Sequence, residues 1–211
     1  MPVHRPSDIV LASNNPGKLR EIGQLLAGAG VAVQPQRAFG LPEAEETGLS
    51  FVENAILKAR HAAAGSGLAA IADDSGIEVD ALDGAPGIYS ARYAGPGADD
   101  QANNDKLLAD LAEVPDGART ARYRCVMVYV RHPLDPTPLI CLGTWEGRIL
   151  RAPRGENGFG YDPLFFVPTH GCAAAELDPE TKNRLSHRGQ ALRALVAQIT
   201  DAAGQHQHAD D

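Results

Sequence analysis

Two adjacent acidic residues, Asp73 and Asp74, directly follow an apolar run and are the first candidates for chemistry. The run from Leu68 to Ala72 has the length and composition of a buried β-strand. Carboxylates at the end of a buried strand are costly unless a cation or hydrogen-bond donors stabilise them. Ligands of α/β sheets also tend to bind at the carboxyl ends of strands. We therefore expect one of these acids to bind a metal ion, and the same residue or its neighbour to deprotonate water.

A second acidic pair, Glu45 and Glu46, could supply a further metal ligand. Mg²⁺ prefers oxygen ligands, usually one or two carboxylates together with phosphate oxygens and water. Taken alone, the pair is more typical of an exposed acidic loop. A helix should begin soon after it, because Ser50 and Glu53 match the capping box, in which each side chain accepts from a free backbone N–H group.

The segment from Ser13 to Lys18 has the composition of an anion site at the start of a helix. Asn15 is a suitable N-cap and Pro16 a suitable first helical residue. Free N–H groups at a helix N-terminus favour a bound anion, and the lysine adds a full positive charge. The segment is not a Walker A loop, because Leu19 follows the lysine where Ser or Thr would bind Mg²⁺. An ordinary capped helix with a surface lysine has the same sequence.

Two later segments could recognise an aromatic base. Glycines around the aromatics of Gly158 to Pro163 would let the backbone approach a flat ligand, with Phe159 stacking on a purine and Asp162 accepting from a ring N–H group. Lys182 and the segment Ser186 to Gly189 bring cationic and hydroxyl groups together, and donors such as His187 and Arg188 would suit a carbonyl oxygen and so could select keto over amino purines. A turn with core aromatics and a solvated helix start are the alternatives.

The bulk composition limits the classes of protein. The chain has 211 residues, of which 44% are hydrophobic, as expected for one globular domain or two lobes that share a core. A net charge of −8 argues against nucleic acid as a partner, yet local lysines could still hold a small phosphorylated substrate. The three cysteines are widely spaced, which favours reduced thiols over zinc or disulfides. We expect no membrane association and a cytoplasmic location, because no apolar run matches a membrane span or a secretory signal.

Local patterns alternate between strand and helix and predict an α/β fold with a mixed sheet. Strand-like runs at 122–130 and 139–150 should form a hairpin. A helix is expected over 100–112, and an amphipathic last helix should carry residues 192–199. We expect one two-lobed domain over residues 1–204, followed by a polar, disordered tail at 205–211.

These motifs together resemble the inosine triphosphate pyrophosphatase family. The resemblance covers Ile9 to about Ile199, and the motifs follow the family's order. Its markers are Ser13-x-Asn15-x-x-Lys18, Glu45-Glu46-Thr47-Gly48, Phe51-x-Glu53-Asn54-Ala55-x-x-Lys58-Ala59, Ala72-Asp73-Asp74-Ser75-Gly76, Gly84-Ala85-Pro86-Gly87-Ile88-Tyr89-Ser90-Ala91-Arg92, Gly158-Phe159-Gly160-Tyr161-Asp162-Pro163 and Ser186-His187-Arg188-Gly189.

The resemblance implies a two-lobed α/β fold with a central mixed β-sheet flanked by helices, an active site in the cleft between the lobes, and a homodimer. It implies Mg²⁺ as the cofactor, held by Glu45 and Asp74, with Asp74 also the catalytic base. Implied contacts to the triphosphate are Ser13, Asn14, Asn15, Pro16, Gly17, Lys18 and Lys58. Implied contacts to the nucleoside and base are Ser75, Phe159, Gly160, Tyr161, Asp162, Lys182, His187 and Arg188.

The function implied by the resemblance is Mg²⁺-dependent hydrolysis of deaminated purine nucleoside triphosphates (ITP, dITP and XTP). The products would be the nucleoside monophosphate and pyrophosphate, so that the enzyme clears these nucleotides from the pool. Two alternatives stay open: a related pyrophosphatase acting on modified pyrimidine triphosphates, and a catalytically silent nucleotide-binding protein.

Overall fold

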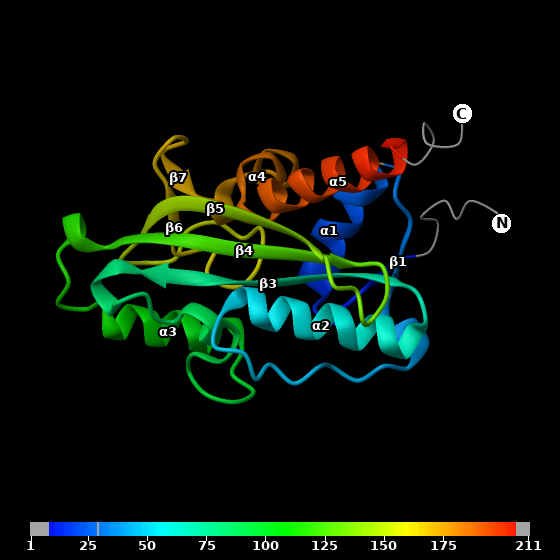
Figure 1. The fold of residues 1–211 in the computed structure, drawn as a ribbon. Helices are drawn as coiled ribbons and strands as arrows, with labels where there is room; N and C mark the ends of the chain where they lie inside the picture. Colours follow the sequence, from blue (N-terminus) through cyan, green and yellow to red (C-terminus); the bar gives the residue numbers. More distant parts are fainter. Residues whose placement is uncertain (1–8, 29, 206–211) are drawn as a thin grey trace. The chain divides into compact units, whose positions relative to one another are not determined.

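The computed structural model of the protein describes residues 9–28 and 30–205. Strands and helices alternate in the first part of the chain, and two helices end it (Figure 1). The strands are β1 (Ile9–Leu11), β2 (Val33–Pro35), β3 (Ala69–Val79), β4 (Thr120–Val130), β5 (Leu139–Ile149), β6 (Phe165–Val167) and β7 (Cys172–Ala173). The α-helices are α1 (Pro16–Gly28), α2 (Phe51–Ser66), α3 (Asp100–Asp110), α4 (Pro179–Leu185) and α5 (His187–Gln205).

The strands form a seven-stranded sheet in the order β2-β1-β3-β4-β5-β6-β7. β1 pairs in parallel with β2 and β3, whereas β6 pairs antiparallel with β5 and β7. Parallel neighbours need crossover connections, and α1 and α2 supply them between β1, β2 and β3. The predicted α/β class with a mixed sheet flanked by helices is therefore confirmed, and the predicted hairpin strands are the neighbours β4 and β5.

Capping residues define the starts of the first two helices as their sequences predict. The Asn15 side chain accepts from the Lys18 N–H group at 3.1 Å, and Pro16 is the first residue of α1. At α2 the Ser50 hydroxyl accepts from the Glu53 N–H group at 3.3 Å. The Glu53 carboxylate in turn accepts from the Leu49 N–H group at 3.0 Å, which completes a reciprocal cap.

The central strand β3 differs from its predicted extent. We predicted a strand over 68–72 with the acidic pair after it, but β3 continues to Val79 and contains Asp73 and Asp74. Its parallel neighbour β1 is the strand that ends early, at Leu11, which pairs with Ile71. The two acids therefore lie just beyond the end of β1, although within β3.

Shorter elements were not predicted. The strands β2, β6 and β7 have at most three residues each, and α4 has seven, so that hydrophobic periodicity is too brief to reveal them. At the C-terminus α5 includes Gln205, and residues 206–211 of the predicted tail lie outside the described residues.

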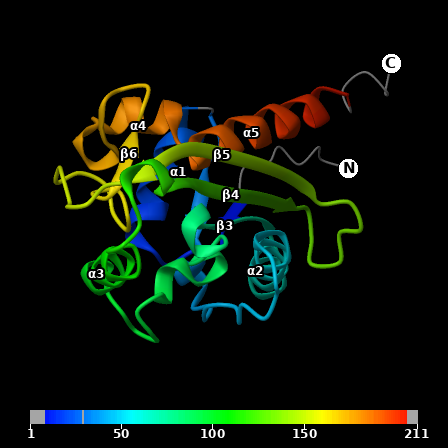
Figure 2. The ribbon, with the colours of Figure 1, turned by 90° about the vertical axis from the view of Figure 1, so that its left-hand side faces the viewer.

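Contacts divide the chain into two compact units, and three of the strands pass from one to the other. Unit 1 comprises Met1–Asp74, Val126–Leu142 and Arg188–Asp211, and unit 2 comprises Ser75–Cys125 and Gly143–His187. In unit 1, α2 lies on one face of the sheet and α5 on the other (Figures 1 and 2). Alanines of α2 pack there against small apolar residues of β1, β3 and β4.

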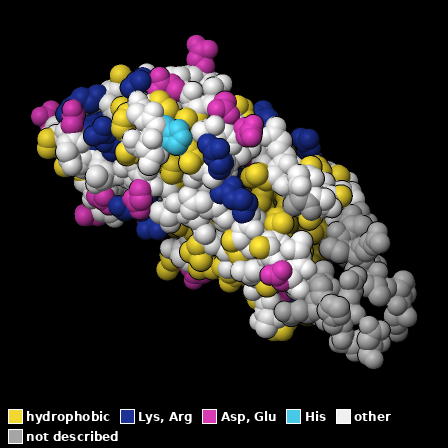
Figure 3. All heavy atoms as spheres, turned by 90° about the horizontal axis from the view of Figure 1, so that it is seen from above, with side chains coloured by type: hydrophobic (Ala, Val, Ile, Leu, Met, Phe, Trp, Pro, Cys, Tyr) yellow, Lys and Arg dark blue, Asp and Glu magenta, His cyan; other side chains and the backbone are white. Residues whose placement is uncertain are grey.

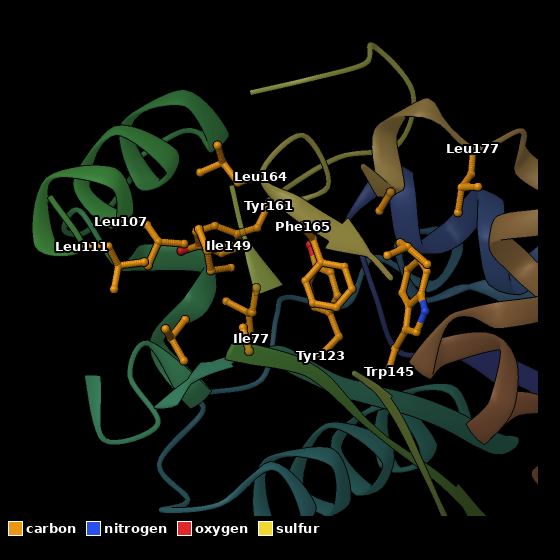
Figure 4. Close-up of a cluster of buried hydrophobic side chains, with 14 residues drawn as sticks. Ile77, Leu107, Leu111, Tyr123, Trp145, Ile149, Tyr161, Leu164, Phe165 and Leu177 are labelled. Carbon is orange, nitrogen blue, oxygen red and sulfur yellow. The ribbon is translucent and has the colours of Figure 1, made fainter. Parts of the chain in front are cut away.

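Unit 2 has a core of larger side chains, shown in Figure 4. Tyr123, Trp145 and Phe165 pack with their rings in contact at its centre, and Leu107 and Leu111 bring α3 against it. This core fixes the elements that carry the second group of candidate site residues.

The surface carries charges of both signs. On the face drawn in Figure 3, lysine and arginine side chains are interspersed with acidic ones. No helix within residues 9–28 and 30–205 is long and apolar enough to cross a membrane.

Candidate active site

Asp73 and Asp74 are buried in β3, with 1% and 6% of their surfaces exposed. Successive side chains of a strand point to opposite faces of the sheet. Asp73 accordingly meets residues of α1 and α5, because its Oδ2 lies 3.0 Å from Nζ of Lys18 and 3.4 Å from Nε of Arg188. Asp74 meets α2, with its Oδ1 2.7 Å from Nζ of Lys58. The pleat thus places the two acids in different environments.

Asp73 belongs to a buried network of charges. Arg188 also donates from Nη1 to Oε2 of Glu21 at 2.6 Å, so that its guanidinium joins α1, β3 and α5. Burial alone would raise the pKa of Asp73, but the positive charges of Lys18, Arg188 and Lys58 hold that pKa far below its ordinary value. Asp73 is therefore stabilised in its charged form, and it links these helices to the strand.

Asp74 has properties suited to chemistry. Burial raises the pKa of its carboxyl group above the ordinary value, and the charge of Lys58 opposes this rise. Its Oδ2 atom is buried and has no hydrogen-bond partner among the residues that the structure describes. A buried carboxylate oxygen of this kind is suited to bind a cation or to accept a proton from water.

Lys58 connects Asp74 to the acidic loop before α2. Its Nζ lies 3.0 Å from Oε1 of Glu46, whereas Glu45 is exposed. Burial by itself would lower the pKa of Lys58, but the charges of Asp74, Asp73 and Glu46 outweigh it and the pKa is raised. The lysine therefore stays protonated and holds a glutamate near Asp74.

These residues fit a magnesium site of the usual kind. Within the described parts of the chain, no three His, Cys, Asp or Glu side chains gather as a preformed metal cage. Mg²⁺ usually takes one or two carboxylates and completes its shell with phosphate oxygens and water. Asp74 and a glutamate of this loop supply that number, while the assignment of Glu45 as the second ligand stays a prediction.

A second contact, in addition to that between Lys58 and Glu46, joins the acidic loop before α2 to that helix. The Gly48 N–H group donates to Oδ1 of Asn54 at 2.8 Å, and Asn54 is fully buried one helical turn before Lys58. A side chain at position 48 would meet Asn54 and Glu53. Sequence reasoning assigned no role to Asn54, although its place four residues before a site lysine was a usable signal.

The segment from Ser13 to Lys18 connects β1 to α1 and includes the first turn of that helix. The Asn15 N–H group donates to Oγ of Ser13 at 3.2 Å, and the Asn14 Oδ1 atom is buried with no hydrogen-bond partner among the described residues. Gly17 is buried, and Pro16 is exposed. The helix start predicted for this segment is present, and its contact with a triphosphate stays a prediction.

In unit 2, Asp162 organises the predicted base-binding segment. Its carboxylate accepts from Nζ of Lys182 at 2.6 Å, from the Phe159 N–H group at 2.9 Å and from the Tyr123 hydroxyl at 3.2 Å. Nζ of Lys182 also lies 5.1 Å from the centre of the Phe159 ring. Asp162 is thus an anchor for this loop and for the lysine, and its predicted contact with a ring N–H group stays a prediction.

The other predicted base contacts have clear structural partners. Tyr161 is buried in the core of unit 2 and donates its hydroxyl to the Ser90 carbonyl at 2.7 Å. The buried His187 ring stacks on Tyr123, with centroids 4.5 Å apart. Ser75 is half-buried on β3, next to Asp74. Tyr123 was missed because its strand pattern is that of an ordinary core residue.

For Arg188 and Lys58, the structure shows side-chain partners that the sequence did not predict. The Arg188 guanidinium contacts Asp73 and Glu21 within unit 1, and its predicted contact with the base stays a prediction. Lys58 was expected near phosphates, and it lies beside Asp74. The structure thus brings Lys18, Lys58 and Asp74 into one unit, and Phe159, Asp162, Lys182 and His187 into the other.

The fold and these side chains define a class: an α/β protein with buried carboxylates on a central strand, lysines of the flanking helices beside them, and an aromatic, glycine-rich loop. The chain belongs to the Ham1 family, whose sequence pattern matches residues 9–198. The family resemblance inferred from the sequence motifs is thereby confirmed.

Individual relatives match nearly the whole chain. A protein of Thioalkalivibrio sulfidiphilus named dITP/XTP pyrophosphatase is 64% identical over 191 residues, covering 90% of this chain and 97% of its own length. A Vibrio parahaemolyticus protein of the same name is 59% identical, with coverage of 93% and 98%. The solved structure of a HAM1 protein from Coxiella burnetii has a TM-score of 0.85 and 52% identity, covering 92% of this chain and 99% of that one.

Proposed function

We propose that this protein hydrolyses the deaminated purine nucleoside triphosphates ITP, dITP and XTP to the nucleoside monophosphate and pyrophosphate. The observation that carries the proposal is Asp74, a buried carboxylate with one oxygen on Lys58 and the other without a hydrogen-bond partner among the described residues. The relatives named dITP/XTP pyrophosphatase, at 58–64% identity, support the choice of substrate.

In the proposed reaction a water molecule attacks the α-phosphorus, and the bond between the α-phosphorus and the oxygen bridging to the β-phosphorus breaks. Asp74 takes a proton from the water, and its raised pKa suits a general base better than an ordinary aspartate would. Lys58 and Lys18 neutralise charge on the phosphates and on the departing pyrophosphate.

Mg²⁺ is the proposed cofactor, with Asp74 and Glu45 as its protein ligands. Bound there, it would supply a positive charge to the phosphate oxygens and lower the pKa of water. Glu46 is engaged by Lys58, so that this contact holds the loop while Glu45 remains exposed. The remaining contacts to the triphosphate are assigned to Ser13–Lys18.

Base recognition is assigned to the loop of Phe159, Gly160, Tyr161 and Asp162, together with Ser75, Lys182, His187 and Arg188. Phe159 offers a ring for stacking, and the ammonium group of Lys182 lies beside that ring. Arg188 would act through Asp73 and the start of α5, because its guanidinium is engaged in that network. We further propose that the enzyme is a cytoplasmic homodimer.

A pyrophosphate-release assay tests the substrate. We expect kcat/KM for ITP, dITP and XTP to exceed that for ATP by at least about 10²-fold, because a site that hydrogen-bonds a carbonyl leaves its donors unpaired against an amino group. Activity should require Mg²⁺ and disappear with a chelator. Equal rates on ITP and ATP would contradict the proposal.

Two further outcomes of this assay separate the alternatives, and a separate measurement tests the oligomeric state. A preference for dUTP or dTTP would identify a pyrimidine triphosphate pyrophosphatase, and release of no pyrophosphate from any nucleotide would identify a silent binding protein. Light scattering during gel filtration tests the homodimer, which a monomer mass would exclude.

A further inference from the structure

We propose that Asp100 and Asn104 of α3 are positioning residues for nucleotide recognition. They hold the segment Gly158–Asp162, called the base loop below, by the backbone of Gly160. This inference rests on the proposed function, because that proposal assigns base contact to the loop.

Two hydrogen bonds hold Gly160 from both sides. Its N–H group donates to Oδ2 of Asp100 at 2.6 Å, and its carbonyl accepts from Nδ2 of Asn104 at 2.8 Å. The peptide planes before and after Gly160 are therefore both fixed. Gly160 has a φ of 65°, in the left-handed region that glycine adopts readily. Because the preceding plane joins Gly160 to Phe159, the clamp also restrains the backbone of Phe159.

The clamp is built on a rigid element. Asp100 and Asn104 are one turn apart on α3 and so share a face. Nδ2 of Asn104 also donates to the Asp100 carbonyl at 2.7 Å, so two carbonyl acceptors fix the orientation of its buried amide. The helix itself is held by its N-cap, Asp99, and by Leu107 in the core of unit 2 (Figure 4).

The rest of the base loop is anchored independently of α3. The Tyr161 hydroxyl binds the Ser90 carbonyl, and the Asp162 carboxylate binds Lys182 and Tyr123. Loss of the clamp should therefore free the Phe159–Gly160 part of the loop while the core stays intact. Neither Asp100 nor Asn104 belongs to the acidic and lysine residues of unit 1, so the effect should fall on nucleotide affinity and not on turnover.

Four variants test the clamp. Asp100→Ala removes the acceptor at an exposed position and should fold normally, and Asn104→Leu removes the buried donor at similar size. Asp100→Asn keeps an acceptor oxygen and is the conservative rescue. Gln101→Ala is the matched control, because Gln101 bonds to Asp105 on the same helix, away from the loop.

Hydrogen–deuterium exchange measures directly whether the clamp restrains the base loop. Amide exchange in residues 158–162 should rise in Asp100→Ala and Asn104→Leu, and stay at the wild-type rate in Asp100→Asn and Gln101→Ala. Unchanged exchange in Asp100→Ala would overturn the clamp whether or not Asn104→Leu folds.

Steady-state kinetics with ITP measure the effect of the clamp on nucleotide affinity. KM should rise about tenfold in the two disruptive variants while kcat stays within about twofold, since a misplaced contact remote from the reacting atoms weakens binding. A fall in kcat with unchanged KM would overturn the inference. Calorimetric titration with IMP repeats the comparison without catalysis. If the wild-type enzyme binds IMP but has no activity, the proposed function is excluded and this inference is not. If all variants bind IMP with equal affinity, this inference is excluded.

Discussion

The ammonium group of Lys58 lies 2.7 Å from Oδ1 of Asp74, and the same group lies 3.0 Å from Glu46. One residue of α2 therefore ties the central strand to the acidic loop that precedes the helix. Asp73, the next residue back along β3, points to the other face and pairs with Lys18 and Arg188. The alternation of a β-strand thus gives two adjacent acids different partners.

Asp74→Asn should lower kcat for ITP by at least about 10²-fold, because an amide can neither accept the proton from water nor supply a charged metal ligand. The fold should survive, since Lys58 keeps its contact with Glu46. Measurements of kcat and of the thermal midpoint check both statements. Glu43→Gln, which neutralises an exposed carboxylate of the same loop region, is the control and should behave as wild type. Near-normal turnover in Asp74→Asn would remove Asp74 from the mechanism.

Asp73→Asn should act mainly on stability. The substitution leaves the buried Arg188 and the partly buried Lys18 without their shared carboxylate, and loss of one member of a buried ion pair costs about 3–5 kcal/mol. Urea unfolding should show this loss in the free energy of unfolding, whereas Glu113→Gln, at an exposed acid, should show none. Unchanged stability combined with a kcat as low as that of Asp74→Asn would instead place Asp73 in the reaction.

Short-range sequence signals predicted the parts of the fold that depend on local chemistry. The caps Asn15 and Ser50, and the alternating strands β4 and β5, were predicted from residue types at fixed spacing. The interactions that favour these elements are made between neighbours along the chain, so the local sequence is enough to predict them.

The difference between the surroundings of Asp73 and Asp74 was not predictable in this way. It depends on the continuation of β3 past the end of β1, which tertiary pairing decides. The anchors of the base loop were also missed, because Asp100 and Gly160 are 60 residues apart and each has an ordinary local pattern. A contact between such distant residues can be recognised only from the folded structure, which brings their elements together.

Asp135→Asn should destabilise the protein in a pH-dependent manner. The Asp135 carboxylate accepts from the side chain and N–H group of Arg131 and from the Thr137 N–H group, and these bonds hold its pKa well below the ordinary value. A lowered folded-state pKa stabilises the protein above the unfolded-state pKa of about 3.9, and this stabilisation is lost as the pH falls below that value.

The expected loss at neutral pH is about 1–2 kcal/mol, because the half-exposed Arg131 is partly screened by solvent. Urea unfolding of both proteins between about pH 7 and pH 3 should show the difference shrinking toward the acid end. A difference that is constant with pH would assign the effect to packing and not to the carboxylate charge.

Gly48→Ala should displace the acidic loop from α2. An added Cβ atom would lie 2.6 Å from Cβ of Glu53 and 2.8 Å from Oδ1 of Asn54, closer than side-chain atoms normally approach. The bond from the Gly48 N–H group to Asn54 would then be strained or lost, and Glu45 and Glu46 would move with the loop. We expect kcat to fall about tenfold and the Mg²⁺ concentration for half-maximal activity to rise, because ligand geometry controls both. Gly117→Ala is the matched control, since a Cβ atom there has no neighbour within 4 Å. Equal Mg²⁺ requirements in the two variants would show that the contact between Gly48 and Asn54 does not position the metal ligands.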